Sequence, residues 1–231
     1  MFADYLGFTF LSLLDSSIFS ILELLIVPVI TVIYFVSRKK RAFFFLLFLV
    51  CYSSADILHI IDDDNLSETL YFVCNILYVV SFLFLLFEIL KALDVRIIVR
   101  RFLIQTIVLF ILVIYLFTVL YGIIDPILFE TNVINLVRFV EHSYNFILLV
   151  LLAISFLNFL EKDTKKSLFL FIGCLSISFS DFLLIGYYYL SDIEILNYIA
   201  IVLNIFAFVM FYLQTDAGID SKKKTLRSSL N

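Results

Sequence analysis

Long apolar stretches alternate with short charged segments along the 231-residue chain. A hydrocarbon core of about 30 Å is crossed by about 20 helical residues, which rise about 1.5 Å each. Seven stretches reach this length: residues 17–37, 42–61, 69–90, 102–124, 133–160, 167–190 and 195–214. A barrel strand would need only about ten residues of alternating polarity, so these runs indicate helices. The pattern predicts an all-α, polytopic membrane helix bundle with seven transmembrane helices.

The composition supports the same class of protein. Hydrophobic residues make up 64% of the chain and charged residues 16%, and the mean hydropathy is +1.13. Soluble domains have about 45–50% apolar and about 25% charged residues, so a water-soluble fold is excluded. The three cysteines all lie in apolar stretches without metal-ligand spacing. We therefore predict no disulfide framework, no metal site and no cofactor.

The charges predict the orientation of the chain in the membrane. Fifteen of the 16 basic residues lie in alternate polar segments, at 38–41, 91–101, 162–166 and 222–227. The segments between them are acidic, at 62–68, 125–130 and 192–194. The positive-inside rule then places the N-terminus outside and the C-terminus in the cytoplasm. Since the rule accounts for the basic segments, they do not indicate nucleic-acid binding.

Three parts of the chain are expected. Residues 1–16 contain an apolar run too short to span a bilayer and lack the basic start of a signal peptide, so we expect a short interfacial segment. Residues 17–215 form the seven-helix transmembrane domain, and residues 216–231 a basic cytoplasmic tail. The expected location is the cell membrane (the inner membrane if the source is bacterial), and the expected partner is the lipid bilayer.

Five charged residues lie inside the apolar stretches: Glu23, Asp56, Arg138, Glu141 and Asp181. On insertion scales such a residue costs about 2.5–3.5 kcal/mol at the bilayer centre, which makes each one a functional hypothesis. All five lie in the outer halves of their stretches, whereas the cytoplasmic halves are mostly aliphatic and Phe. This depth predicts one polar cavity that opens outward or to the outer leaflet.

Polar residues also recur at helical spacing. Tyr52, Asp56 and His59 follow one another at intervals of four and three, which puts them on one helix face. The same holds within three other stretches, for Tyr71, Asn75 and Tyr78, for Arg138, Glu141, His142 and Asn145, and for Cys174, Ser178 and Asp181. A single Asn, Ser or Tyr is better explained by a hydrogen bond between helices, worth about 0.6 kcal/mol on average. The set of three carboxyl groups, one arginine and one histidine favours a site.

Several classes of membrane protein do not fit. A retinal protein needs a lysine in the seventh stretch, which has none. Zinc-dependent hydrolases need several histidines, and the chain has only His59 and His142, on different stretches. Five unclustered glycines do not make the loop of a rhomboid-like protease. Ion-coupled transporters show repeats or broken helices, and Pro28 is the one proline within a stretch, so a transporter is disfavoured.

Four short motifs, spread over residues 20–214, resemble the YhhN/lysoplasmalogenase family. Residues 53–58 (SSADIL) resemble its Gly-Asp-x-x-Leu signature, and residues 173–184 (GCLSISFSDFLL) resemble its Gly-Ala-x-x-Phe-x-x-Ser-Asp-x-x-Leu element. Residues 74–78 (CNILY) stand where the family has Ala-His-x-x-Tyr, and residues 141–149 resemble a Tyr-containing helix. The resemblance implies an integral membrane hydrolase that cleaves the vinyl ether bond of lysoplasmalogens into a fatty aldehyde and a glycerophospho head group.

The chain also differs from the family pattern at three points. Asn75 stands in place of the family histidine, Ala55 in place of a glycine, and one N-terminal helix of the usual eight is missing. An asparagine does not exchange protons near neutral pH. The alternative is therefore a non-catalytic lipid-binding or structural membrane protein on the same scaffold, with a lysophospholipid-like ligand.

Vinyl ether hydrolysis begins with protonation of a carbon atom, so the site needs one protonated acid and one carboxylate that stabilises positive charge. We expect Asp56 and Asp181 to be this pair, with Glu141 assisting. The expected substrate-binding residues are Asn75, Tyr78, Arg138, His142, Tyr144 and Ser180. Among them Arg138 suits a phosphate group.

Overall fold

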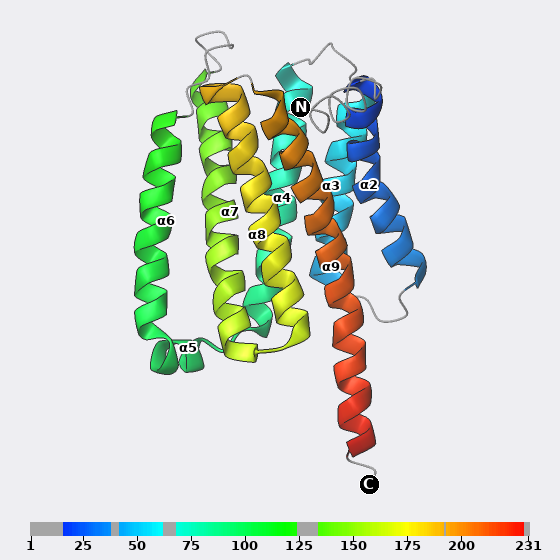
Figure 1. Ribbon diagram of the computed structural model, residues 1–231, viewed down its shortest axis with the longest axis vertical. Helices are drawn as coiled ribbons and strands as arrows, with labels where there is room; N and C mark the ends of the chain where they lie inside the picture. The colour runs from blue at the N-terminus through cyan, green and yellow to red at the C-terminus, as the bar shows by residue number, and fades with distance from the viewer. Residues whose placement is uncertain (1–15, 38–41, 62–67, 124–133, 192, 229–231) are drawn as a thin grey trace, which may run out of the picture.

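The computed structural model describes residues 16–37, 42–61, 68–123, 134–191 and 193–228, which are helical apart from short turns (Figure 1). The α-helices are α2 (Ser16–Ser37), α3 (Phe43–Ile61), α4 (Glu68–Ala92), α5 (Val95–Arg101), α6 (Leu103–Ile123), α7 (Ile134–Lys162), α8 (Lys165–Ile185) and α9 (Glu194–Ser228). A π-helical turn, η1 (Gly186–Leu190), continues α8. No strand occurs in these ranges. The predicted all-helical architecture is confirmed.

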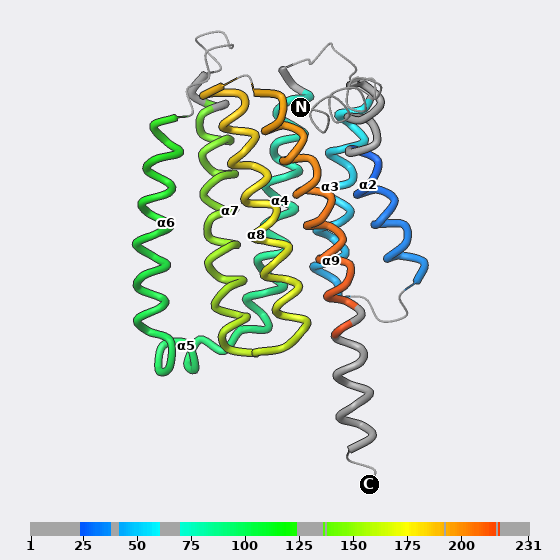
Figure 2. The backbone as a smooth tube through the Cα atoms, in the orientation of Figure 1, coloured from blue at the N-terminus to red at the C-terminus, as the bar shows by residue number. Residues whose placement is uncertain are grey.

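Within the described residues, six helices are long and apolar enough to cross a membrane: α3, α4, α6, α7, α8 with η1, and α9. The first predicted stretch coincides with α2, whose Leu24–Ser37 part forms a shorter apolar helix. The long helices run alternately up and down (Figure 2). The chain is thus a multi-pass membrane protein of the helical type.

Six helices form a closed ring, and α6 lies outside it. Around the ring α2 packs on α3, α3 on α4, α4 on α7, α7 on α8 and α8 on α9, and α9 contacts α2 again. Among the long helices α6 packs mainly on α7, and it stands at the edge of the bundle in Figure 1. The ring therefore brings α3, α4, α7 and α8 together around one interior.

Phenylalanines fill the interior of the ring. Phe48 on α3 stacks on Phe208 of α9 with ring centroids 5.9 Å apart, and Phe82 of α4 lies 6.1 Å from Phe48. Phe211 meets Phe48 edge-on, and all four rings are fully buried. A Cβ atom at Gly173 of α8 would lie 2.5 Å from the Phe211 ring, so this glycine allows the close approach of α8 and α9.

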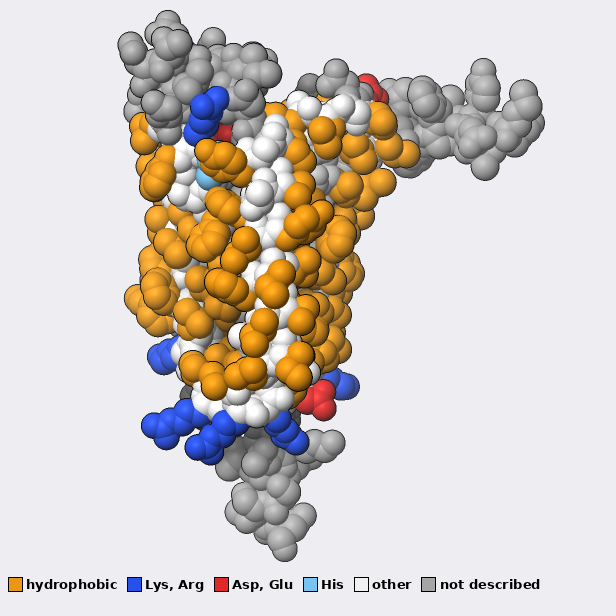
Figure 3. All heavy atoms as spheres, turned by 90° about the vertical axis from the view of Figure 1, so that its left-hand side faces the viewer, with side chains coloured by type: hydrophobic (Ala, Val, Ile, Leu, Met, Phe, Trp, Pro, Cys, Tyr) orange, Lys and Arg blue, Asp and Glu red, His pale blue; other side chains and the backbone are white. Residues whose placement is uncertain are grey.

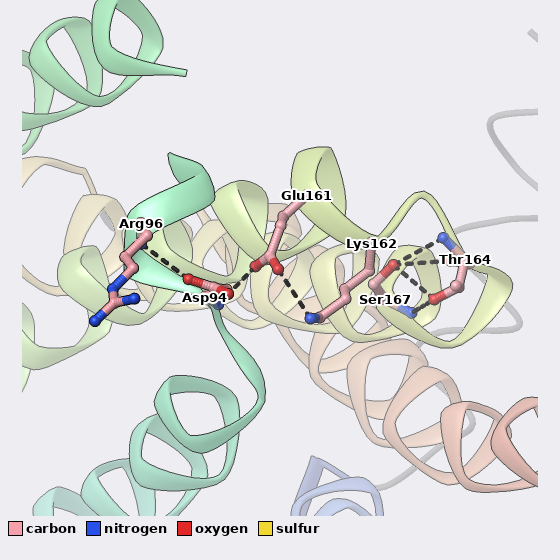
Figure 4. Close-up of polar contacts among 6 residues, drawn as sticks. All are labelled: Asp94, Arg96, Glu161, Lys162, Thr164 and Ser167. Carbon is pink, nitrogen blue, oxygen red and sulfur yellow. Dashed lines mark hydrogen bonds and ion pairs between the residues drawn. The ribbon is translucent and has the colours of Figure 1, made fainter. Parts of the chain in front are cut away.

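Short polar turns end the helices at one end of the bundle. Asp163 has φ = 44°, a left-handed conformation that terminates α7 directly after Lys162. Thr164 then caps α8, because its hydroxyl accepts from the Ser167 N–H while the Ser167 hydroxyl accepts from the Thr164 N–H (Figure 4). The chain thereby reverses direction within a few residues.

Two features of the chain differ from the expected pattern. The segment after the third stretch contains a helix, α5, that the pattern did not predict, since seven residues are too few for a periodic signal. The helix α9 continues to Ser228, so the backbone of the expected tail is helical as far as that residue. Of the expected interfacial segment, residues 1–15 lie outside the described residues.

Candidate functional site

Asp56 is the most deeply buried carboxyl group of the candidate site. It lies on α3 with 3% of its surface exposed, and the Tyr78 hydroxyl on α4 donates a hydrogen bond of 2.8 Å to its Oδ1 atom. Tyr52, one turn before Asp56, packs edge-on against the Tyr78 ring at 4.8 Å. The predicted face of α3 therefore points into the ring of helices, where its carboxyl group receives a partner from α4.

A second pair joins α7 to α8. The Tyr144 hydroxyl donates a hydrogen bond of 2.6 Å to Oδ2 of Asp181, and both residues are half-buried. The Tyr144 ring also packs against Phe82 of α4, at 5.5 Å, and Phe82 packs against Tyr52 at 5.9 Å. Phe82 and Tyr52 thus connect the environment of Asp181 to that of Asp56.

A third pair joins α4 to α7. The Tyr71 hydroxyl donates a hydrogen bond of 2.9 Å to Oε1 of Glu141. Tyr71 precedes Tyr78 by seven residues on α4, which separates the two hydroxyl-bearing residues by about 10 Å along the helix axis. The other carboxyl oxygen of Glu141, Oε2, is buried and has no hydrogen-bond partner among the described residues. Glu141 therefore lies closer than Asp56 to the end of the bundle that is opposite the basic segments.

These six residues form the tyrosine–carboxyl layer: Asp56, Tyr71, Tyr78, Glu141, Tyr144 and Asp181. Each carboxyl group accepts from a tyrosine on a different helix, so the three bonds link α3, α4, α7 and α8 in series. All three bonds lie within the usual O–H···O range of about 2.5–3.0 Å. The layer therefore places one phenol hydroxyl against each carboxyl group.

Two predicted binding residues are held by main-chain oxygens. The Asn75 amide donates to the Tyr71 carbonyl oxygen of its own helix, at 2.9 Å. The Ser180 hydroxyl, which is 1% exposed, donates at 2.7 Å to the Ala200 carbonyl oxygen of α9. Both bonds are structural, since the first stays within α4 and the second ties α8 to α9.

The polar residues predicted to share one face of α7 contact three different helices. Glu141 points to α4, whereas His142 stacks on the Tyr121 ring of α6, with centroids 4.3 Å apart, and Tyr144 points to α8. Adjacent helical residues diverge by about 100°, so Glu141 and His142 reach different helices. Arg138, one turn before Glu141 on α7, is exposed.

A groove opens between α2 and α9. Its lining is apolar: Ile30, Ile33, Val209 and Tyr212. It lies toward the basic end of these helices, away from the tyrosine–carboxyl layer. The cavity expected at that layer remains a prediction.

The sequence pattern overlooked two tyrosines as site residues. Tyr71 and Tyr52 each share a face with an expected site residue, Tyr78 and Asp56 respectively, and the spacing of four and seven residues was the available signal. Their roles depend on which helix lies opposite, which the spacing does not specify. Across the described residues, no group of three or more His, Cys, Asp or Glu side chains is placed to hold a metal ion.

Comparison with known proteins identifies no relative of the chain. No protein-family model, curated protein or solved structure matches the chain. The class of the protein therefore rests on its own helices, which make it a multi-pass helical membrane protein with a tyrosine–carboxyl layer in one half of the bundle.

Proposed function

We propose that the chain is a membrane-embedded hydrolase that cleaves the vinyl ether bond of lysoplasmalogen-type lysophospholipids. The observation that supports this proposal is the pair of carboxyl groups Asp56 and Asp181. Each accepts a hydrogen bond from one phenol hydroxyl of a neighbouring helix. The Phe82 ring lies between the two pairs, since it packs against Tyr144 on one side and Tyr52 on the other. The resemblance of the motifs around Asp56 and Asp181 to the YhhN family supports the same reaction.

The two carboxyl groups take different roles in this reaction. Asp56, which is 3% exposed and bonded at 2.8 Å, is the protonated acid that transfers its proton to the β-carbon of the vinyl ether. Asp181, bonded at 2.6 Å, is the carboxylate that stabilises the resulting oxocarbenium ion. Water then adds to this ion, and its proton leaves to a carboxylate. The hemiacetal separates into a fatty aldehyde and the glycerophospho alcohol.

The location of the layer suits a lysophospholipid. The three carboxyl groups lie in the half of the bundle opposite the basic segments, so a head group could remain near the surface while the chain enters the apolar interior. Arg138 is exposed on α7 one turn before Glu141, at the end where a phosphate would lie. A guanidinium can bind phosphate through two hydrogen bonds.

The proposed topology has seven spans with the N-terminus outside. The helix α2 has 22 residues and is about 33 Å long, which is enough to cross a hydrocarbon core of about 30 Å. Lysines and arginines gather at one end of the molecule below a broad apolar surface (Figure 3). The positive-inside rule makes this end cytoplasmic and puts the tyrosine–carboxyl layer in the outer leaflet.

A turnover assay tests the proposed function. Purified protein is incubated with a lysoplasmalogen or an ordinary acyl lysophospholipid, and released fatty aldehyde is measured. We expect aldehyde from the lysoplasmalogen alone, and we expect Asp56→Asn to lower the rate at least about 100-fold. Glu88→Gln removes a carboxyl group of α4 outside the layer and should leave the rate unchanged. An unchanged rate in Asp56→Asn would exclude Asp56 as the acid.

A second function is favoured by Asn75. Its amide is bonded to the main chain of its own helix, and an amide supplies no proton. A protein that binds lysophospholipid without cleaving it would retain the lipid through purification and release no aldehyde. The same assay, combined with mass spectrometry of the bound lipid, separates this function from the hydrolase.

A further inference from the structure

Two buried oxygen atoms lie one turn apart on α7, and neither has a hydrogen-bond partner among the described residues. They are Oε2 of Glu141 and Oδ1 of Asn145, a residue that is only 5% exposed. Residues four apart are neighbours on one face of a helix. Leaving a buried polar atom without a partner costs free energy, so two such atoms on one face indicate that something joins them.

The surrounding hydrogen bonds decide what each atom can do. The Asn145 amide nitrogen donates to the Glu141 main-chain oxygen at 2.9 Å, which makes Oδ1, the other end of the amide, an acceptor. Oε1 of Glu141 accepts from the Tyr71 hydroxyl of α4, also at 2.9 Å. An ionised Glu141 is an acceptor only, and two acceptors do not bond to each other. A bond between Oε2 and Oδ1 therefore requires a proton on Glu141.

The titratable side chains around Glu141 come from α4, α6, α8, η1 and α7 itself: Tyr71, Tyr121, Asp181, Tyr189, Arg138 and His142. The charge of Arg138 acts on His142, whose ring is stacked toward α6. Within the described part of the chain, the influences on Glu141 are its own burial and the bond from Tyr71. A buried carboxyl group without a countercharge becomes neutral.

We infer that Glu141 and Asn145 form a proton-binding site, in which Glu141 carries a proton on Oε2 and donates a hydrogen bond to Oδ1 of Asn145. A small rotation about the last side-chain bond of Glu141, whose torsional minimum is broad, is available to close this bond. One proton then satisfies both oxygens and leaves the carboxyl group neutral in the apolar interior.

The site has a consequence for the packing of α4 on α7. Glu141 joins these two helices through Tyr71, at the end of the bundle opposite the basic segments. A proton held there makes their contact sensitive to the pH on that side of the membrane. The inference does not depend on the proposed hydrolase activity, and its tests measure no turnover.

Infrared spectroscopy detects the proton directly, because a protonated carboxyl group has a C=O stretching band that an ionised one lacks. Spectra of the purified protein are recorded in nanodiscs at neutral pH. Glu141→Gln should lose one such band. Glu88→Gln is the control, since it removes a carboxyl group one turn before Lys91 near the basic end of α4, and it should lose none.

The frequency of the same band tests the acceptor, because a carboxyl group that loses a hydrogen bond absorbs at higher frequency. Asn145→Leu should move the Glu141 band to higher frequency. Asn158→Leu is the matched control: Asn158 lies on the same helix, is 4% exposed and has a buried Oδ1 atom without a partner among the described residues. This control should leave the band in place.

Two substitutions of Glu141 separate a proton from a charge. Glutamine resembles protonated glutamate, since its oxygen can accept from Tyr71 and its amide can donate to Asn145. Glu141→Gln should therefore unfold at nearly the same fraction of sodium dodecyl sulfate as the parent protein. Glu141→Leu makes neither bond and should unfold at a lower fraction.

The pH dependence of unfolding counts the proton. Between about pH 6 and 8 an unfolded glutamate is ionised, whereas the folded chain keeps the proton on Glu141, so unfolding releases one proton. The unfolding equilibrium constant of the parent should then rise with pH more steeply than that of Glu141→Gln, by up to about tenfold per pH unit.

Three results would overturn the inference. A Glu141→Gln protein that keeps every protonated-carboxyl band would show that Glu141 is ionised. A Glu141→Gln protein that does not fold, or that is as unstable as Glu141→Leu, would show that the negative charge is needed, as for a bound Na⁺ ion. An unmoved band in Asn145→Leu would remove Asn145 as the acceptor.

Discussion

Double-variant cycles on the two tyrosine–aspartate pairs test the charge states that we propose for Asp56 and Asp181. The Tyr144–Asp181 hydrogen bond is 2.6 Å long and the Tyr78–Asp56 bond is 2.8 Å long. The four variants are Tyr144→Phe, Asp181→Leu, Tyr78→Phe and Asp56→Leu, together with the double variant of each pair. Each pair acts as the control of the other, since both consist of one tyrosine and one aspartate on adjacent helices.

The expected magnitudes differ enough to be measured. A hydrogen bond to an ionised group contributes about 1.5–3 kcal/mol, and we expect a coupling energy in this range for Tyr144 and Asp181. A neutral hydrogen bond between membrane helices contributes about 0.6 kcal/mol on average, and we expect this value for Tyr78 and Asp56. The single variants cost more than the coupling alone, because each leaves a buried polar group without its partner.

Equilibrium unfolding provides the assay. The protein is unfolded with sodium dodecyl sulfate in mixed micelles and followed by far-ultraviolet circular dichroism, since the chain has no tryptophan signal. The coupling energy is the part of the double variant's free-energy change that the two single variants do not explain. It isolates the pair from the other contacts of each residue.

The outcome distinguishes three situations. A larger coupling for Tyr144 and Asp181 than for Tyr78 and Asp56 supports the assignment of Asp181 as the carboxylate. The reverse order would exchange the roles of the two aspartates. Equal couplings of about 0.6 kcal/mol would refute the reasoning, because both pairs would then be ordinary neutral bonds between helices.

Three further predictions concern packing, charge and topology. Gly173→Ala should lower the free energy of unfolding by about 1–3 kcal/mol, because its methyl group meets the Phe211 ring, and Phe211→Leu should recover part of this loss, measured in the same unfolding assay. Arg138→Ala should change that free energy by no more than about 0.5 kcal/mol, because Arg138 is exposed; a loss of several kcal/mol would reveal a buried charge pair. In a cysteine-free background, Asp63→Cys should react with an impermeant thiol reagent in intact cells and Lys223→Cys should not; labelling of Lys223→Cys would reverse the topology.

Helix positions could be predicted from the sequence with little error. The stretch predicted at 69–90 is α4 (Glu68–Ala92), and the stretch at 133–160 is α7 (Ile134–Lys162). This agreement has a local cause: whether a segment is long and apolar enough to span depends on its own side chains and on the thickness of the bilayer. The helix α5 escaped prediction because contacts with Glu161 and the burial of Ile98 hold it in place, and these are tertiary interactions.

The polar residues of the site were also visible in the sequence, but their pairing was not. Tyr71 and Tyr78 share one face of α4, yet one donates to α7 and the other to α3. Glu141 and His142 are adjacent, yet they reach α4 and α6. In each case the partner depends on which helix occupies the neighbouring position in the ring.

The sequence by itself determined the class of the protein, the extent of its helices and the set of polar side chains that enter the membrane, because each of these follows from local transfer free energies. Only the tertiary structure decided that each carboxyl group receives a tyrosine hydroxyl from another helix, that Asn75 is bonded to its own helix, and that α6 packs outside the ring of the other long helices. These outcomes depend on the order and crossing of helices. Apolar surfaces of nearly uniform character do not encode that order along the chain, because lipid tails and leucine side chains are equally good neighbours.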